Sequence, residues 1–493
     1  MQQLTGVDAS FLYMEGPTTF GHVSSLIVYD PKGTDAAGYE ATRELFAERL
    51  HLLEPMRRKL VPVPLGIDHP YWIEDPHLDL DFHIRQTAVA PPGTDEQLAE
   101  LVARLIARPL DRSRPLWELY VIYGLESGHI AQLTKIHHAA IDGVGGAQLL
   151  ANILSLEPGA PPPPGELPEP ERVPTQEEML VRGLASVATR PYKQGRLAIR
   201  LLRELPQIGK AFDWAGLGRS VPEPVARVFG QAPRREEEET PAVLSLTGGF
   251  TRPSTRFNNK IGPHRRFAFT SVPLSDVKAV KEALGVTVND VVLGMCAGAL
   301  RTYLDERGEL PEESLRCMIP VSVRTEEQAN TWGNRVSGML AALATDVADP
   351  VARLKVIHEE TIRAKQALGA VPGDLLTDVA EFAPPVLFSQ ATRVLTRSAI
   401  ANRIDPPFNL IISNVPGPQF PLYAGEAEML SYIPVSAVAD TQGLNMTIMS
   451  YNGRCDFGLV ACRDAVPDLW DLCHLLEDSL EELKEIAGVS SSS

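Results

Sequence analysis

The sequence has few cysteines and no closely spaced pair of them. The five are dispersed over the second half of the chain, and none forms a C-x-x-C motif; they are Cys296, Cys317, Cys455, Cys462 and Cys473. An odd number of dispersed cysteines excludes a disulfide scaffold and a zinc site of the usual ligand spacing. We therefore expect a cytoplasmic protein whose cysteines are small buried hydrophobic residues.

The chain also lacks a long hydrophobic run. Its best candidate, Val291–Leu300, has about half the length that a transmembrane helix needs. The first residues, MQQLTGVDASF, show no basic region followed by an apolar stretch, so we expect no secretory signal. These features predict a protein without a membrane span, and they leave attachment to a membrane surface open.

An excess of positive charge is absent as well. Among 493 residues, 46 are lysine or arginine and 63 are aspartate or glutamate, which gives a net charge of −17. This balance weighs against nucleic-acid partners, because they bind a basic face. With 44% hydrophobic residues the composition is that of an ordinary globular protein, and the length corresponds to two or three domains.

Proline-rich segments divide the chain. Residues 157–174 read EPGAPPPPGELPEPERVP, and residues 232–243 hold four successive glutamates between two prolines. Neither composition suits a helix or a central strand. We therefore predict an N-terminal domain at 1–156, a proline-rich linker and helical connector at 157–249, and a C-terminal domain at 250–493.

Both predicted domains mix strands and helices, so the expected fold class is α/β with mixed sheets. Hydrophobic periodicity predicts helices at 274–284, after Asn289-Asp290 and at 467–487, and another that follows residue 143. Gly285 is the expected C-cap of the first of these. Runs of β-branched and aromatic residues predict strands at 22–30, 115–123, 129–136, 316–323, 337–347, 408–413, 444–451 and 456–462.

The motif HHAAIDG at residues 137–143 carries the chemistry. An HHxxxDG pattern is expected by chance in about one chain in a thousand of this length. It lies in the loop between a predicted strand and a predicted helix, a place where functional residues gather. Imidazole is well suited to accept a proton near neutral pH, Asp142 can orient a ring, and Gly143 permits a tight turn. The pattern therefore favours a histidine general base.

Two other interpretations of this motif stay open. One is a structural pair of histidines followed by a turn at Asp142. The other is a metal site, although neighbouring histidines rarely point at one ion and the sequence offers no third ligand.

Further phrases follow one another along the chain. They are LTGVDASFLYMEGPTTFGHVSSL at 4–26, PLWE at 115–118, NDVVL at 289–293, PVSVR at 320–324, NVPGP at 414–418 and LNMTIMSYNG at 444–453. Together with HHAAIDG they closely resemble the bacterial wax ester synthase/diacylglycerol acyltransferase family of the CoA-dependent acyltransferase superfamily. The resemblance spans nearly the whole chain.

This resemblance implies two chloramphenicol-acetyltransferase-like domains with an active-site tunnel at their interface. The expected substrates are acyl-CoA and either diacylglycerol or a long-chain alcohol. His138 is implied as the catalytic base, with no cofactor, no metal and no acyl-enzyme. His137, Asp142 and Gly143 are implied as supporting residues.

The resemblance also implies partners for these residues. Asp142 is expected to pair with an arginine, for which Arg57 is our candidate, and Asn289 and Asp290 are expected to form the other wall of the tunnel. We expect Trp117 of the PLWE phrase to be a packing residue, and likewise Phe457 of Asp456-Phe457-Gly458, which resembles part of a plant acyltransferase motif.

Two alternatives of other kinds accompany this assignment. One is an acyltransferase that works like a peptide-synthetase condensation domain, and the other is a non-catalytic lipid-binding protein of the same fold. Residues 196–212 read as a basic amphipathic helix, which is either a packed connector or a surface that docks on a membrane or lipid droplet. We therefore expect a protein that is peripherally associated with a lipid surface.

Overall fold

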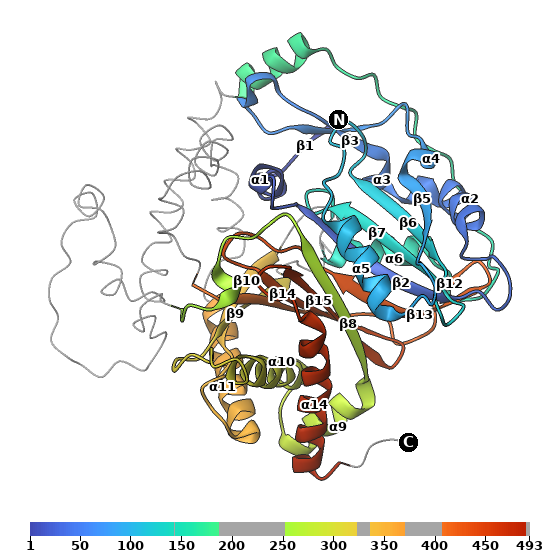
Figure 1. The fold of residues 1–493 in the computed structure, drawn as a ribbon. Coiled ribbons are helices and arrows are strands. Elements are labelled where there is room, and N and C mark those ends of the chain that lie inside the picture. The colour runs from blue at the N-terminus through green and yellow to red at the C-terminus, as the bar shows by residue number, and fades with distance from the viewer. Residues whose placement is uncertain (142, 187–251, 323–335, 370–406, 490–493) are drawn as a thin grey trace, which may run out of the picture.

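The computed structural model describes residues 1–141, 143–186, 252–322, 336–369 and 407–489. In this part of the chain two lobes each form around a six-stranded mixed sheet (Figure 1). The expected α/β class is confirmed. The segment 161–175 contains neither helix nor strand, as the prolines of the linker predict.

The first sheet belongs mainly to the N-terminal lobe. Its strands in spatial order are β12 (Tyr423–Ala424), β13 (Ala427–Val435), β2 (His22–Asp30), β7 (Ile130–His137), β6 (Trp117–Tyr123) and β5 (Ile84–Ala88). Only the β5–β6 pair is parallel among these. The helices of this lobe are α1 (Gly6–Met14), α2 (Tyr39–Arg49), α3 (Glu54–Arg57), α4 (Leu80–His83), α5 (Asp95–Ile106) and α6 (Gly143–Ile153).

The second sheet belongs to the C-terminal lobe. Its strands in spatial order are β10 (Val336–Ala342), β9 (Arg316–Ser322), β11 (Leu410–Pro416), β14 (Leu444–Tyr451), β15 (Arg454–Cys462) and β8 (Arg265–Pro273). The helices beside it are α9 (Leu274–Leu284), α10 (Val288–Asp305), α11 (Pro350–Gly369) and α14 (Leu469–Ala487), and they gather below the sheet in Figure 1. A third, small sheet has the order β1 (Gln2–Gln3), β4 (Tyr71–Glu74) and β3 (Arg58–Val61).

Local sequence signals place several of these elements as expected. The strands predicted at 22–30 and 444–451 and the helix predicted at 274–284 have those bounds in the structure. Gly285 ends α9 in the left-handed region with a φ of 70°, which glycine adopts without a Cβ penalty. Helix α10 begins with a capping box between Thr287 and Asp290, so its start is set by these two residues.

Two strands from the C-terminal part of the chain join the N-terminal sheet, which the predicted domain ranges do not anticipate. Strands β12 and β13 lie within the predicted C-terminal domain, yet β13 pairs antiparallel with β2 in the N-terminal sheet. Asp456 on β15 supports this crossing, because its carboxylate accepts a hydrogen bond from the Tyr432 backbone N–H of β13 at 2.9 Å. A Cβ at Gly458 would lie 1.7 Å from the Pro434 carbonyl oxygen. Glycine therefore permits the close approach of the two strands.

The hydrophobic core has three main parts. One lies between the C-terminal sheet and its helices, and a second covers the face of the N-terminal sheet that carries α2 and α6. The third is shared by the two lobes, since helix α5 packs there with β2, β6 and β7 of one sheet and with β8 and β15 of the other. All five cysteines are buried and free, as expected. Phe457 and Trp117 are buried packing residues, which confirms both predictions.

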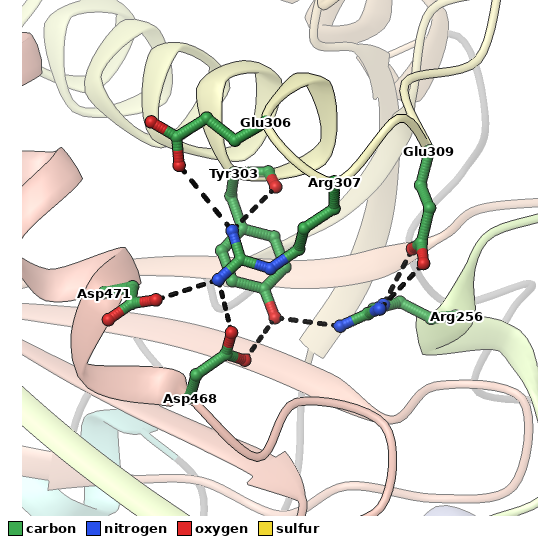
Figure 2. A network of polar contacts seen from close by, with 7 residues as sticks. All are labelled: Arg256, Tyr303, Glu306, Arg307, Glu309, Asp468 and Asp471. Atoms are coloured by element: carbon green, nitrogen blue, oxygen red, sulfur yellow. Dashed lines mark hydrogen bonds and ion pairs between the residues drawn. The ribbon is translucent and has the colours of Figure 1, made fainter.

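A polar network joins the C-terminal part of α10 to the start of α14 (Figure 2). Its centre is Tyr303 of α10, which is fully buried and donates to Asp468 at 2.6 Å. The guanidinium of Arg307 lies 3.8 Å from the centre of the Tyr303 ring and also binds Asp468. Arg256 donates to the Tyr303 hydroxyl at 3.2 Å and pairs with Glu309 at 2.7 Å. We call these residues the Tyr303 network.

Within the described residues, no single helix is long and apolar enough to cross a membrane. Helices α9 and α10 meet the length and composition of a span only when taken together, and a bend of 101° separates them.

Candidate active site

The HHAAIDG loop lies where the sequence predicts it, between the end of β7 and the start of α6. Its first residues are held by backbone hydrogen bonds. His137 N–H donates to the Leu116 carbonyl at 2.9 Å, and His138 N–H donates to the Gly21 carbonyl at 2.8 Å. The loop is thus attached to the entry of β2, and the two histidines take up different positions.

His137 is buried, with 1% of its surface exposed, and both of its ring nitrogens have polar neighbours. Its Nδ1 accepts a hydrogen bond from the Ala139 backbone N–H at 3.0 Å. Its Nε2 lies 3.3 Å from Oε1 of Glu15. Because Nδ1 acts as an acceptor, this geometry is that of a neutral imidazole that carries its proton on Nε2.

Glu15 joins this histidine to its surroundings. Its Oε1 also accepts from the Gly21 backbone N–H at 2.7 Å, and Oε2 accepts from Arg112 Nε at 3.0 Å. Burial raises the pKa of Glu15, but the contacts with His137, Gly21 and Arg112 lower it more, to about 2. The carboxylate is therefore ionised at neutral pH.

His138 is half-buried, in contrast to His137. Its ring stacks on Phe11 of α1, with 4.4 Å between the ring centres and 7° between the planes. A face-to-face stack fixes the plane of the imidazole through the ring face and does not involve its nitrogens. A histidine base requires such a fixed ring plane.

Asn289 and Asp290 lie in the C-terminal lobe, at the N-terminal end of α10. Asn414 donates to the Asn289 side chain at 3.4 Å. Asp290 is buried, and its carboxylate contacts His358 at 2.7 Å and Thr361 at 2.8 Å, both on α11. Burial raises the pKa of Asp290, and the hydrogen bonds from His358, Thr287 and Thr361 lower it below its ordinary value. Asp290 therefore links two helices, and the tunnel wall stays a prediction.

Asp142 lies outside the described residues, so its pairing with Arg57 also stays a prediction. The structure assigns Arg57 other partners. Its guanidinium pairs with Glu74 at 3.0 Å and donates to the carbonyls of Leu50 and His51. Gly143 is the first residue of α6.

Sequence reasoning assigned no role to three residues that contact the histidines, namely Phe11, Glu15 and Gly21. All three lie inside the phrase at 4–26. A Cβ at Gly21 would lie 2.5 Å from His137 Nε2, so only glycine fits against the ring. Each of these residues contacts a histidine that lies more than 100 positions away in the sequence. Local periodicity and charge pattern therefore do not distinguish them from ordinary residues of a helix or turn.

The seam between the lobes adjoins this loop. His22 on β2 lies opposite His137 in the strand register, and it lines a small pocket together with Ser24, Arg265 of β8 and apolar residues of both lobes. Burial and the nearby positive charge of Lys135 together lower the pKa of His22 to about 3. His22 is therefore neutral at physiological pH. Among the described residues, no three His, Cys, Asp or Glu side chains gather as metal ligands.

The arrangement of two mixed sheets has counterparts among solved structures. The chain matches the first condensation domain of the CDA synthetase with a TM-score of 0.53 and 13% identity, over 100% of this chain and 97% of that one. At this identity the match shows the fold alone.

Closer similarity identifies the family. Residues 4–292 match the wax ester synthase/diacylglycerol acyltransferase catalytic domain, and residues 332–484 match the C-terminal domain of the same family. The wax ester synthase/diacylglycerol acyltransferase from Marinobacter aquaeolei VT8 is 31% identical, with a TM-score of 0.69 over 99% of this chain and 100% of that one. A Mycobacterium tuberculosis H37Rv protein named "Probable diacyglycerol O-acyltransferase tgs2" is 38% identical over 98% of both chains.

The chain therefore belongs to the wax ester synthase/diacylglycerol acyltransferase family, and it is an acyltransferase of that type.

Proposed function

We propose that this enzyme transfers a long-chain fatty acyl group from acyl-CoA to the hydroxyl of diacylglycerol or of a long-chain alcohol. The products are triacylglycerol or wax ester, and free CoA. The names of the Marinobacter and Mycobacterium relatives support both acceptor classes.

His138 serves as the general base in this proposal. Its imidazole takes the proton of the acceptor hydroxyl while the oxygen attacks the thioester carbonyl. The tetrahedral intermediate then collapses, the C–S bond breaks, and the imidazolium returns the proton to the CoA thiolate. The sequence has no G-x-S-x-G motif, and this route requires no acyl-enzyme.

The observation that carries this assignment is the different environment of the two histidines. His137 is buried and both ring nitrogens have polar neighbours, Ala139 N–H and Glu15. Proton transfer by His137 would disrupt these contacts. His138 is half-buried, and a stack holds its ring in one plane. His138 is thus the member of the pair that suits proton transfer.

We also propose that the enzyme works at a membrane or lipid-droplet surface. Diacylglycerol and long-chain alcohols reside in lipid, so an enzyme that uses them has to reach an interface. The basic amphipathic pattern at 196–212 supports this idea from the sequence. That segment lies outside the described residues.

The test uses purified protein with palmitoyl-CoA and three acceptors: diacylglycerol in vesicles, hexadecanol and a short soluble alcohol. CoA release is followed with a thiol reagent and the lipid products are separated by chromatography. We expect His138→Ala to lower the rate by about 10²–10⁴-fold, the usual contribution of general-base catalysis, with an unchanged Tm.

His137→Ala provides the comparison, and it should lose less activity than His138→Ala. If His138→Ala released CoA at the wild-type rate in the presence of acceptor, the assignment of the base would be wrong. If the wild-type enzyme acylated no hydroxyl acceptor at all, the proposed reaction would be wrong.

A further inference from the structure

We propose that Phe11 and Glu15, which lie on α1 and at its end, are positioning residues for the histidine pair: Phe11 sets the ring plane of His138, and Glu15 sets the tautomer of His137. This inference rests on the proposed role of His138 as the base. It assigns a catalytic purpose to the first helix of the chain.

The spacing of the two residues allows one helix to reach both histidines. Phe11 and Glu15 are four positions apart, so they lie one above the other along the same side of a helix. Helix α1 begins after Thr5, whose hydroxyl accepts from the Asp8 backbone N–H at 3.1 Å, and it ends at Glu15. The N-cap therefore sets where the helix starts and so where Phe11 and Glu15 lie.

Contacts from this side of α1 meet the loop at successive residues. Phe11 stacks on His138 with 4.4 Å between the ring centres. Glu15 lies 3.3 Å from His137 Nε2 and 2.7 Å from the Gly21 backbone nitrogen. Gly21 connects Glu15 to the loop, because its carbonyl accepts from the His138 backbone N–H. Helix, glycine and loop thus form one connected unit.

The charge of Glu15 determines where His137 carries its proton. An ionised carboxylate accepts hydrogen bonds only, so it favours the tautomer with the proton on Nε2. Nδ1 then carries no proton and can accept from the Ala139 N–H at 3.0 Å. With the other tautomer, Nδ1 would present a proton to that N–H, and the loop around His138 would have to shift. Small displacements of a catalytic group can cost as much as 100-fold in rate.

Arg112 holds the other side of the carboxylate. It donates to Oε2 of Glu15 from Nε at 3.0 Å and to the Leu12 carbonyl of α1 at 2.5 Å. Because Arg112 touches neither histidine, it supports the orientation of Glu15 and the end of α1. The helix, the loop and the segment around residue 112 are therefore fixed relative to one another.

The experiment compares Glu15→Ala and Glu15→Gln with the wild type. In Glu15→Gln the side-chain amide oxygen can still accept from Gly21 N–H and can stay beside His137 Nε2, whereas alanine provides no oxygen at either place. We expect Glu15→Ala to lower kcat by about 10–100-fold while KM for palmitoyl-CoA changes less than about threefold. Glu15→Gln should recover most of kcat. For Phe11, the Phe11→Leu variant should lower kcat, and Phe11→Tyr, which keeps the ring, should recover it.

Asp276→Asn is the matched control. Asp276 is similarly buried, with 8% of its side chain exposed against 13% for Glu15, and it pairs with Lys484 at 2.8 Å in the other lobe. We expect this variant to lose stability and to keep the wild-type kcat. An equal loss of kcat in Asp276→Asn and Glu15→Ala would show a general effect of destabilisation and would overturn the proposal.

A second measurement does not depend on activity. With ¹⁵N-labelled histidine, NMR should detect the Nε2–H tautomer of His137 in the wild type and in Glu15→Gln, and its loss in Glu15→Ala. An unchanged tautomer in Glu15→Ala would overturn the role of Glu15 even if no hydroxyl acceptor were found. Wild-type kcat in Glu15→Ala would do the same.

Discussion

Two polar networks in the molecule join distant parts of the chain, and they differ in whether they contact the HHAAIDG loop. In the C-terminal lobe, the Tyr303 network connects α10 with the start of α14 through Asp468 (Figure 2). In the N-terminal lobe, Glu15 connects α1 with Arg112 and with His137. The first network holds helices together. The second also reaches the loop of the proposed base, so one kind of interaction serves stability in one lobe and orientation in the other.

In both networks the exposed fraction of the side chains rises from the centre to the rim. Tyr303 is fully buried at the centre of its network, whereas 39% of the Glu309 side chain is exposed at the rim. His137 is 1% exposed, Glu15 is 13% exposed, and Arg112 is 47% exposed. Position along this gradient should set the stability effect of a substitution, and contact with the loop should set its effect on catalysis.

The largest stability effect is expected for Tyr303→Ala. This change removes a fully buried aromatic ring and leaves the carboxylate of Asp468 and the guanidinium of Arg307 without it. Loss of a buried aromatic side chain typically costs about 3–5 kcal/mol. Urea unfolding followed by circular dichroism measures the free energy, and the activity of the folded fraction should equal that of the wild type.

Tyr303→Phe separates the ring from the hydroxyl. It should cost only about 1–3 kcal/mol, because the ring stays and Asp468 loses one donor. A fall in kcat of the folded Tyr303 variants would show that the Tyr303 network also affects catalysis, and the contrast between the two networks would then be wrong.

The sequence was sufficient for the family, the fold class and most strands. Alternating and β-branched runs predict β2 and β14 to the residue, since these strands lie in the middle of their sheets and bury side chains on the core face. In the two six-stranded sheets the same approach missed β5, β8, β12 and β13. Strand β13 pairs with β2, which lies about 400 residues away in the chain, and β12 pairs with β13. Local periodicity holds no information about such a distant partner.

The residues of the candidate site also fall into those that the sequence predicts and those that only the structure reveals. The motif makes His138 the candidate base because its residue types and spacing are rare, and the structure places the motif in a loop as predicted. Phe11, Glu15 and Gly21 carry no such signal. Their roles come from the packing of α1 against that loop. Trp117 was assigned to packing correctly, and the structure gives the reason: its ring stacks with His83 and its Nε1 donates to the Met56 carbonyl.

Acid should affect the N-terminal network through Glu15. Its pKa is lowered from 4.5 to about 2 in the folded protein, so its ionised form stabilises the fold fully above about pH 4.5. This contribution, on the order of 3 kcal/mol, is lost as the pH falls from about 4.5 toward 2. The difference in unfolding free energy between wild type and Glu15→Gln, measured from pH 7 to pH 3, should therefore shrink with acidification.

The Tyr303 network contains a carboxylate with the same sign of shift. Burial raises the pKa of Asp468, but hydrogen bonds from Tyr303 and Arg307 lower it below its ordinary value. Asp468→Asn should thus also approach the wild type in acid. A difference for Glu15→Gln that stayed constant down to pH 3 would show that the charge of Glu15 contributes nothing to stability.

The smallest effect is expected at the rim of the Tyr303 network, for Glu309→Gln. Glu309 pairs with Arg256 at 2.7 Å, but 39% of its side chain is exposed, so water and salt screen the pair. We expect a loss of about 0.2–1 kcal/mol that decreases further in 0.5 M NaCl, with wild-type kcat. Arg256 keeps its contact with the Tyr303 hydroxyl in this variant, which limits the loss. A cost above about 2 kcal/mol would mean that Glu309 holds Arg256 against the buried ring, and the gradient from centre to rim would then be wrong.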